Sequence, residues 1–164
     1  MLMKDLKRMK KAGLSTEELR AVEAALSVRE KAYAPYSGYK VGVAVLDTFG
    51  EVHVGVNCEN HIYKVGHAEE HACGAMLAAG SRKFNVLVCA SANGGIPCGS
   101  CLQIMREWAD DDLSKTTIIG VCTGNPSEVV RCTLLEAIQV TDSFGPQDLN
   151  PYVDGLAECR NGRR

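Results

Sequence analysis

Two short motifs carry side chains that can hold a metal ion and move protons. The first is His67-Ala68-Glu69, and the second is Cys98-Gly99-Ser100-Cys101, which follows Pro97. Two cysteines separated by two residues are a common zinc-binding arrangement, because a helical turn can aim both sulfurs at one ion. We therefore expect His67, Cys98 and Cys101 to bind zinc. Three protein ligands leave the fourth position of the ion to water, as a catalytic zinc site requires.

Glu69 lies two residues from His67, which is too close for both to bind the same tetrahedral ion. We expect Glu69 instead to reach the water at the metal and to transfer protons. A non-catalytic zinc-binding module remains an alternative, although it gives no reason for a carboxylate beside an open coordination position. The run His67-Ala-Glu-Glu-His71 also matches the H-x-x-E-H pattern of some zinc proteases. That interpretation leaves the two cysteines unexplained.

Both motifs are predicted to begin helices, and these helices alternate with strands along the chain. The first predicted helix starts at Ser15, which forms a capping box with Glu18, and continues until Pro35 stops it. Three further helices are predicted over residues 67–79, 98–109 and 133–138. The predicted strands cover residues 39–46, 51–56, 85–92, 116–123 and a short stretch near Val129. This alternation predicts an α/β fold in which helices cover both faces of a sheet.

The length of 164 residues fits one domain. We expect a basic N-terminal extension over residues 1–14, a main domain over residues 15–150 and a tail over residues 151–164. The extension is predicted to be either an amphipathic helix through Leu2, Leu6 and Met9 or a frayed segment.

Charge and hydropathy exclude several classes of partner. Residues 12–159 contain ten Lys and Arg against nineteen Asp and Glu, and aromatic residues make up 5% of the chain. A nucleic-acid partner is disfavoured, because phosphates are bound by basic side chains and bases by aromatic ones. No apolar stretch approaches the roughly 20 residues of a membrane span, and no secretory segment is recognised. We therefore expect no membrane partner and a cytoplasmic location.

The chain has eight cysteines, which we do not interpret as a disulfide framework. Cys73, Cys89, Cys122 and Cys132 each lie in an apolar segment, and we expect them to be small buried side chains.

The sequence resembles the cytidine deaminase family from about residue 33 to residue 149. The similar segments, in the family's order, are Ala34-Pro-Tyr-Ser-Gly-Tyr-Lys-Val-Gly-Val-Ala44, Gly55-Val-Asn-Cys-Glu-Asn60, His67-Ala-Glu69, Pro97-Cys-Gly-Ser-Cys-Leu-Gln103, Leu134-Leu135 and Ser143-Phe-Gly-Pro-Gln-Asp-Leu149. The H-x-E and P-C-x-x-C motifs are the signature of zinc-dependent nucleobase deaminases. The resemblance implies a three-layer α-β-α sandwich with a mixed, roughly five-stranded central sheet.

The resemblance also implies an activity, namely zinc-dependent hydrolysis of cytidine or deoxycytidine to the uracil nucleoside and ammonia, in pyrimidine salvage. It implies one Zn²⁺ per subunit, with Glu69 catalytic. Asn57 and Glu59 match residues that bind the ribose, and Tyr39 and Phe144 match aromatic residues near the base. The backbone near Ala68 and Pro97 would orient the base and the leaving group.

Departures from the family pattern leave two questions open. His67 stands where short family members have cysteine and longer dimeric members have histidine, so the expected homo-oligomer is a tetramer by length and a dimer by ligand set. Ile96 and Glu136 stand where a hydroxyl residue and a proline are usual. An alternative substrate is therefore a modified cytosine nucleoside, such as an antibiotic of the blasticidin type.

Overall fold

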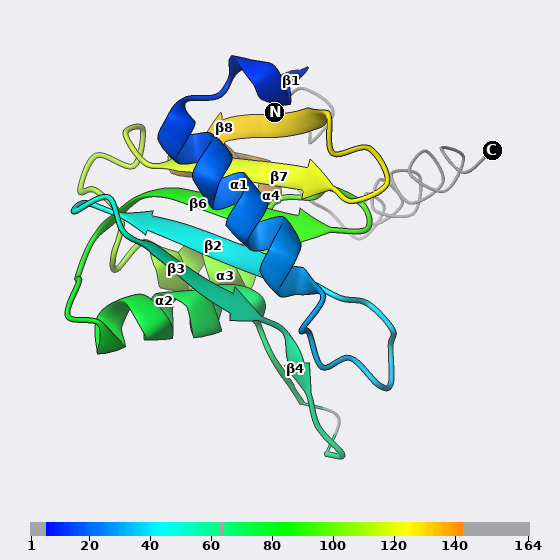
Figure 1. The fold of residues 1–164 in the computed structure, drawn as a ribbon. Helices are drawn as coiled ribbons and strands as arrows, with labels where there is room; N and C mark the ends of the chain where they lie inside the picture. Colours follow the sequence, from blue (N-terminus) through cyan, green and yellow to red (C-terminus); the bar gives the residue numbers. More distant parts are fainter. Residues whose placement is uncertain (1–5, 63, 143–164) are drawn as a thin grey trace.

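A mixed six-stranded sheet runs through the centre of the molecule in the computed structural model, which describes residues 6–62 and 64–142 (Figure 1). Its strands, in the spatial order β1-β8-β7-β6-β2-β3, are β1 (Arg8–Lys10), β8 (Glu128–Thr133), β7 (Thr117–Cys122), β6 (Phe84–Ser91), β2 (Gly42–Asp47) and β3 (Val52–Val56). β6 and β7 pair in parallel, and the other neighbours in this sheet pair antiparallel. The expected mixed sheet is confirmed, with one strand more than the five predicted.

Helices cover both faces of this sheet, as the alternating pattern predicts. One face is covered by α1 (Thr16–Arg29), and the other by α2 (Ala68–Ala78), α3 (Gly99–Met105) and α4 (Leu134–Asp142) (Figure 1). The side chains of β2 alternate between two apolar cores. Val43 and Val45 pack on the side of α2 and α3, whereas Ala44 and Leu46 pack against α1. The three-layer α-β-α sandwich is thus confirmed.

The start of α1 agrees with the sequence, but its end does not. The Ser15 hydroxyl accepts from the Glu18 N–H at 3.2 Å and the Glu18 carboxylate accepts from the Ser15 N–H at 2.9 Å, which completes the predicted capping box. The helix ends at Arg29 rather than continuing to Pro35. Tyr33, which lies within the predicted continuation to Pro35, instead forms backbone hydrogen bonds with Asn57 and Glu59.

The N-terminal segment is neither a helix through Met9 nor frayed over its described part. Arg8–Lys10 pair with β8 as an edge strand, and a short 3₁₀ helix, η2 (Lys11–Gly13), leads into α1. Leu6 is 5% exposed and belongs to the core on the side of α2 and α3. Burial of the Leu6 side chain and backbone pairing along the edge of β8 together hold this segment on the domain.

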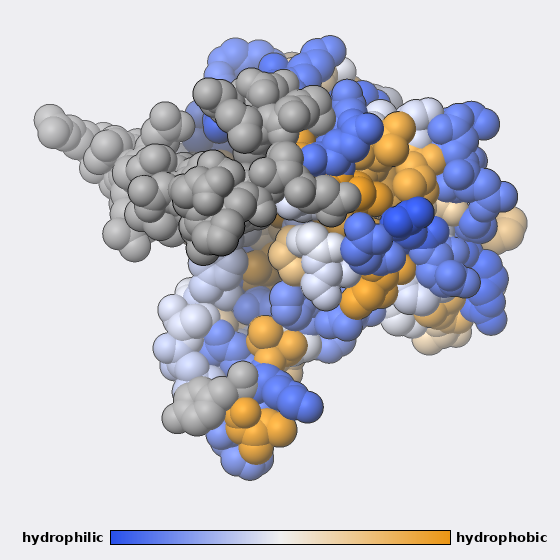
Figure 2. Space-filling view, turned by 180° about the vertical axis from the view of Figure 1, so that it is seen from behind, coloured by the Kyte–Doolittle hydropathy of each residue, from blue (hydrophilic) through white to orange (hydrophobic). Residues whose placement is uncertain are grey.

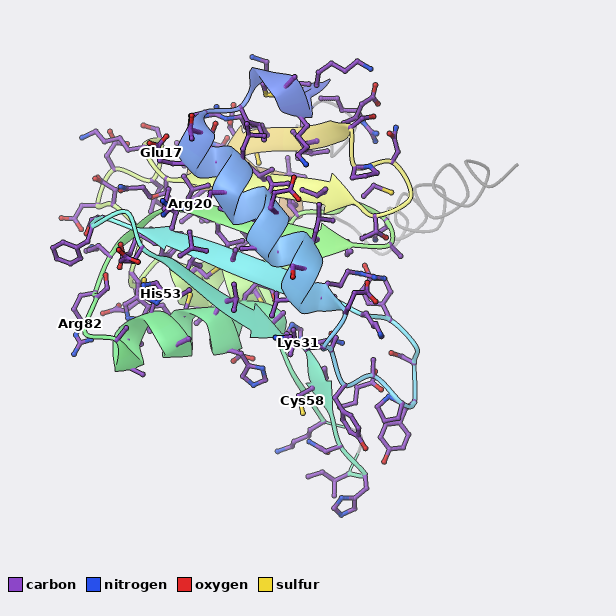
Figure 3. All side chains as sticks on the ribbon, in the orientation of Figure 1. Glu17, Arg20, Lys31, His53, Cys58 and Arg82 are labelled. Atoms are coloured by element: carbon purple, nitrogen blue, oxygen red, sulfur yellow. The ribbon has the colours of Figure 1, made fainter. Side chains whose placement is uncertain are left out.

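A two-stranded hairpin projects from the body of the protein beyond β3. It consists of β4 (Cys58–Glu59) and β5 (Val65–Gly66), which pair antiparallel. Figure 3 shows Cys58 on this projection, and Figure 2 shows apolar residues at its tip, where Ile62 is 59% exposed.

The prediction of buried cysteines is correct for three of the four. Cys73, Cys89 and Cys132 are free and buried in the core. Cys122 is only half-buried and is disulfide-bonded, so the prediction is wrong for this residue, which lies at the last position of β7.

Candidate metal centre and cavity

His67 is placed by the start of α2. It is the N-cap residue, with extended backbone angles, and its N–H donates to the Glu70 carboxylate at 3.1 Å. This capping bond fixes the point where the helix begins. Glu69, the second residue of the helix, consequently lies in the first turn, two residues after His67.

Cys98 and Cys101 are placed in the same way by the start of α3. Cys98 is the N-cap residue, and Cys101 is buried in the first turn. One turn of helix therefore brings both sulfur atoms to the same side, because residues three apart are neighbours on a helix surface.

The three candidate ligands meet in space, although the two motifs are separate in sequence. His67 Nδ1 lies 3.7 Å from Cys98 Sγ and 3.3 Å from Cys101 Sγ, and all three atoms lie within 4.8 Å of one another. Ideal tetrahedral zinc places bound nitrogen and sulfur atoms roughly 3.6 Å apart. The donor set and its spacing therefore fit a zinc ion held by one imidazole and two thiolates.

The two thiols share a hydrogen bond that prepares one of them for metal binding. The bond from Cys101 and nearby backbone N–H groups lower the pKa of Cys98 to about 5. The same bond and burial raise the pKa of Cys101. A metal ion that displaces the remaining proton would hold both sulfurs as thiolates.

Glu69 is buried beside these ligands, with only 5% of its surface exposed. Burial raises the pKa of its carboxyl group, and the neighbouring Cys98 sulfur acts in the same direction. Its position beside the candidate metal ligands suits a group that accepts and donates protons during a reaction.

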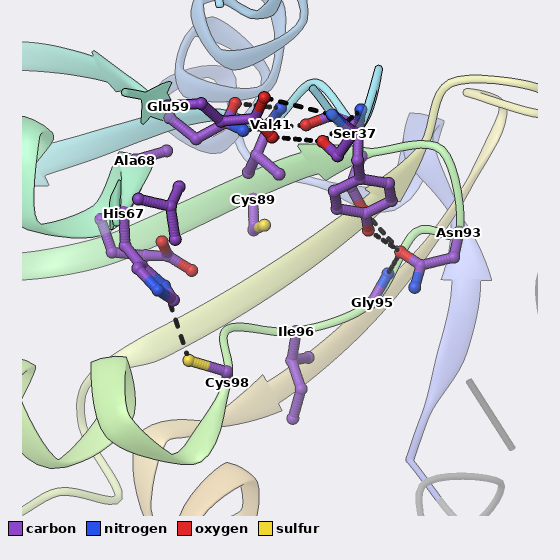
Figure 4. A pocket seen from close by; sticks show the side chains of 15 residues that line it. Ser37, Val41, Glu59, His67, Ala68, Cys89, Asn93, Gly95, Ile96 and Cys98 are labelled. Carbon is purple, nitrogen blue, oxygen red and sulfur yellow. Dashed lines mark hydrogen bonds between the residues drawn. The ribbon is translucent and has the colours of Figure 1, made fainter. Parts of the chain in front are cut away.

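A cavity of about 490 Å³ opens next to the candidate metal ligands (Figure 4). Its walls come from the segment 37–41, the projecting hairpin, the start of α2 and the segment that links β6 to α3. The residues that line it are Ser37, Tyr39, Val41, Asn57, Glu59, Val65, His67, Ala68, Glu69, Cys89, Ser91, Asn93, Gly95, Ile96 and Cys98. Its volume lies in the range of small-molecule sites.

Asn57 lines this cavity, and its amide also joins two segments of backbone. Its oxygen accepts from the Val41 N–H at 2.8 Å, and its nitrogen donates to the Tyr39 carbonyl at 2.8 Å. The side chain is 6% exposed, so these bonds hold the segment 39–41 beside the end of β3.

Glu59 also lines the cavity, and its carboxylate binds the turn before Tyr39. It accepts from the N–H groups of Tyr36 at 2.8 Å and Ser37 at 3.2 Å, and from the Ser37 hydroxyl. The Ser37 hydroxyl and then these N–H groups hold the pKa of Glu59 below its ordinary value. The carboxylate is therefore ionised at neutral pH.

The remaining predicted site residues fall into three groups. Tyr39 and Ala68 line the cavity, and Pro97 is buried directly before Cys98. Phe144 lies outside the described residues. His71, of the alternative protease pattern, directs Nδ1 to the Val56 carbonyl at 2.6 Å, away from the ligand group.

The motifs did not single out several residues of the cavity wall. Cys89 and Ser91 belong to β6, of which Ser91 is the last residue, and Asn93 and Gly95 follow the strand. The available signal was the position of this segment, because loops after parallel strands line ligand sites in open α/β sheets.

Comparison with known proteins supports the resemblance stated from the motifs. A family profile described as the cytidine and deoxycytidylate deaminase zinc-binding region matches residues 15–115. A cytidine deaminase of Halalkalibacterium halodurans is 32% identical over 132 residues, which cover 79% of this chain and 95% of that protein. The chain belongs to the cytidine deaminase family. A cytidine deaminase of Sporosarcina psychrophila is 34% identical over 110 residues, covering 58% of this chain and 81% of that protein.

Solved structures of the cytidine deaminase family share the fold. The cytidine deaminase of Burkholderia pseudomallei superposes with a TM-score of 0.64 at 32% identity, covering 75% of this chain and 95% of that one. The enzyme of Mycobacterium leprae gives the same TM-score at 28% identity, covering 76% of this chain and 98% of that one. As a member of this family, the chain is a hydrolytic deaminase, and His67, Cys98 and Cys101 form its candidate zinc site.

None of the helices in the described part of this family member is both long enough and apolar enough to cross a bilayer.

Proposed function

We propose that this protein hydrolyses cytidine and deoxycytidine to uridine and deoxyuridine, with release of ammonia. The observation that carries the proposal is that His67 Nδ1 and the sulfurs of Cys98 and Cys101 meet beside a cavity. The buried Glu69 side chain lines the same cavity. A zinc ligand set with only three protein donors, next to a buried proton carrier, is suited to hydrolysis rather than to structural support.

His67, Cys98 and Cys101 would hold one zinc ion per subunit. Bound zinc supplies a water that is already activated at neutral pH. The protein's own part is to move protons while the C4–O bond forms and the C4–N bond breaks. Glu69 would carry one proton from the attacking water to N3 of the ring. It would then carry the remaining hydroxyl proton to the amine, which leaves as ammonia.

Asn57 and Glu59 support the assignment of a nucleoside substrate. Both lie on the wall of the cavity, and the ionised Glu59 carboxylate has acceptor capacity beyond the bonds to Tyr36 and Ser37. We assign Glu59 to a ribose hydroxyl. Asn57 would also contact the ribose, while its amide holds the segment 39–41 in place.

Charge favours a nucleoside over a nucleotide. Among the described residues that line the cavity there is no lysine or arginine, and two are carboxylates, Glu59 and Glu69. A 5′-phosphate would meet negative charge without a basic partner, which disfavours binding. We therefore expect cytidine and deoxycytidine to be better substrates than deoxycytidine 5′-monophosphate.

The wider setting is proposed from the same activity. Because the proposed product is a uracil nucleoside, we propose a role in pyrimidine salvage. We also propose that the enzyme acts in the cytoplasm as a homo-oligomer.

The decisive experiment is ultraviolet-monitored turnover of both nucleosides by the zinc-loaded protein and its Glu69→Gln variant. Gln cannot carry a proton, so we expect kcat to fall by roughly 100- to 10,000-fold while zinc content stays unchanged. Removing zinc with a chelator should abolish turnover, and adding zinc back should restore it.

The matched control is Glu107→Gln, which changes an exposed carboxylate outside the cavity and should leave kcat/KM unchanged. Full activity of Glu69→Gln would contradict the proposed proton transfer. Absence of turnover of either nucleoside by zinc-loaded wild-type protein would contradict the proposed substrate.

A further inference from the structure

The oxygen of the Asn93 side chain is surrounded by hydrogen-bond donors. It accepts from the Ser91 hydroxyl at 2.7 Å, from the Tyr39 hydroxyl at 2.8 Å and from the Gly95 N–H at 3.2 Å. Figure 4 shows such bonds converging on this side chain at one end of the cavity. The oxygen end of the amide is therefore fully used by the protein.

These contacts fix which end of the amide faces them. A backbone N–H can only donate, so the atom that Gly95 approaches must be the amide oxygen. The Tyr39 hydroxyl donates as well, because an amide oxygen carries no hydrogen and can only accept. The amide cannot rotate by half a turn without placing N–H₂ against the Gly95 N–H.

The nitrogen end of the amide is different. Within residues 6–62 and 64–142, Asn93 Nδ2 has no hydrogen-bond partner, and no buried side-chain nitrogen or oxygen is left unpaired there. The nitrogen is therefore accessible from solvent or from the cavity that Asn93 lines. Asn57, the other amide of the wall, spends its oxygen and one N–H on backbone.

Few other side chains of the cavity wall have a hydrogen-bond donor left for a ligand. The Ser37 hydroxyl donates to Glu59, and the hydroxyls of Tyr39 and Ser91 donate to Asn93. A pyrimidine nucleoside presents acceptors, namely the carbonyl oxygen at C2, N3 and the ribose oxygens. The fixed N–H₂ group of Asn93 is suited to meet one of them.

We propose that Asn93 is a substrate-recognition residue that donates a hydrogen bond from Nδ2 to an oxygen or nitrogen acceptor of the bound nucleoside. The proposal rests on the proposed function, because it takes the pyrimidine nucleoside as the ligand. Ser91, Gly95 and Tyr39 act through Asn93, since they hold the amide in the orientation that presents its donor.

Steady-state kinetics of an Asn93→Asp variant with cytidine test this role. Aspartate keeps an acceptor for Ser91, Tyr39 and Gly95 but has no N–H₂. We expect KM to rise by roughly 10-fold or more with kcat nearly unchanged, since a donor used equally in the ground state and the transition state acts on binding. Zinc content and melting temperature report whether the variant folds and loads metal.

A second variant, Asn93→Ser, separates loss of the donor from the added charge and serves if Asn93→Asp does not fold. It is neutral and too short to reach the same acceptor, so the same rise in KM is expected. The matched control is Asn125→Asp, which changes an exposed asparagine that accepts from Ser127 and lies outside the cavity wall; its KM should equal that of the wild type.

The outcomes are distinct. One outcome is that the wild-type protein turns over cytidine and a folded Asn93 variant has the same KM. This result overturns the inference about Asn93 and leaves the proposed function in place. Absence of turnover by zinc-loaded wild-type protein overturns the proposed function and this inference with it.

Discussion

Asp47 is a buried carboxylate at the end of β2, and each of its oxygens has a partner. One oxygen accepts from the N–H groups of Phe49 and Glu51, both at 2.9 Å, and the other lies 2.9 Å from His53 Nε2. Burial acts to raise the pKa of Asp47, but the bonds from His53 and from the two N–H groups outweigh it, so the pKa is lowered. The side chain therefore closes the turn between β2 and β3 as an anion.

The sign of this shift predicts how acid changes stability. Because the pKa of Asp47 is lower in the folded state, its stabilising contribution is present above the unfolded value of 3.8 and is lost as the pH falls through the folded value. At pH 7 we expect Asp47→Asn to lower the free energy of unfolding by about 1 to 3 kcal/mol. Urea unfolding at pH 7, 5 and 3 measures the difference, which should shrink at pH 3. A constant difference across this range would contradict the assignment.

At the same scale, sequence predicted the types of the site residues better than their contacts. The motifs predicted four site residues, and the structure places their side chains together: His67, Glu69, Cys98 and Cys101. The pattern around Glu59 gave no sign that its carboxylate would bind the backbone of residues 36–37, because that contact depends on how a distant turn folds. Asn93 was missed for the same reason, since its partner Tyr39 lies far away in the chain.

At the scale of elements, the segment between β6 and α3 is held by close backbone approaches to β7. A side chain at Gly120 would place its first carbon 2.6 Å from the Gly94 carbonyl oxygen and 2.9 Å from that of Gly95. Gly94 itself has a positive φ of 65° and lies against Cys122. Two glycines therefore let the segment that carries Asn93 and leads to Cys98 lie directly on the sheet.

We expect Gly120→Ala to disturb the cavity from a position outside its wall. The added methyl group meets backbone oxygens, so the segment must move, at a cost of about 1 to 3 kcal/mol in unfolding free energy. Zinc affinity and kcat/KM should fall together, as measured by metal titration and cytidine turnover. Gly74→Ala is the matched control: it lies on the exposed side of α2 with open space around it and should stabilise by roughly 0.5 to 1 kcal/mol. An active Gly120→Ala protein with wild-type stability would contradict this account.

Among the helices and strands, features set by local sequence were predicted correctly, whereas features set by long-range contacts were not. The start of α1 was predicted because Ser15 and Glu18 form a capping box within four residues. Its end was not, because the chain leaves the helix to pair Tyr33 with Asn57 and Glu59, which are distant in sequence. The pattern that predicted a helix as far as Pro35 gave no sign of that pairing.

At the scale of the whole molecule, the sheet includes residues that were expected to lie outside the main domain. Leu6 is buried in the core on the side of α2 and α3, and Arg8–Lys10 add a sixth strand. The composition of this segment, rich in lysine and arginine, favoured an extension, although Leu6 and Leu14 are buried in the two cores.

We predict that Leu6→Ala lowers the free energy of unfolding by roughly 2 to 4 kcal/mol, because it removes a buried side chain from the core. Activity below the melting transition should be retained, since Leu6 does not line the cavity. Leu135→Ala, at a position that is 40% exposed on α4, is the control and should cost much less. Chemical denaturation of the three proteins gives the comparison. Equal stability of Leu6→Ala and the wild type would show that the segment does not contribute to the domain.

The edge strand β1 has a further consequence for how separate molecules meet. Lys7, Arg8 and Lys10 are exposed on or beside this strand, and they cover the edge of β8, which contains the buried residues Val129, Val130 and Cys132. Positive charges along an outer strand discourage a second sheet from adding to it, because the two edges would repel. A chain without its first residues would expose a short apolar edge of β8 instead. We expect such a truncated chain to aggregate through this edge before it loses catalytic activity.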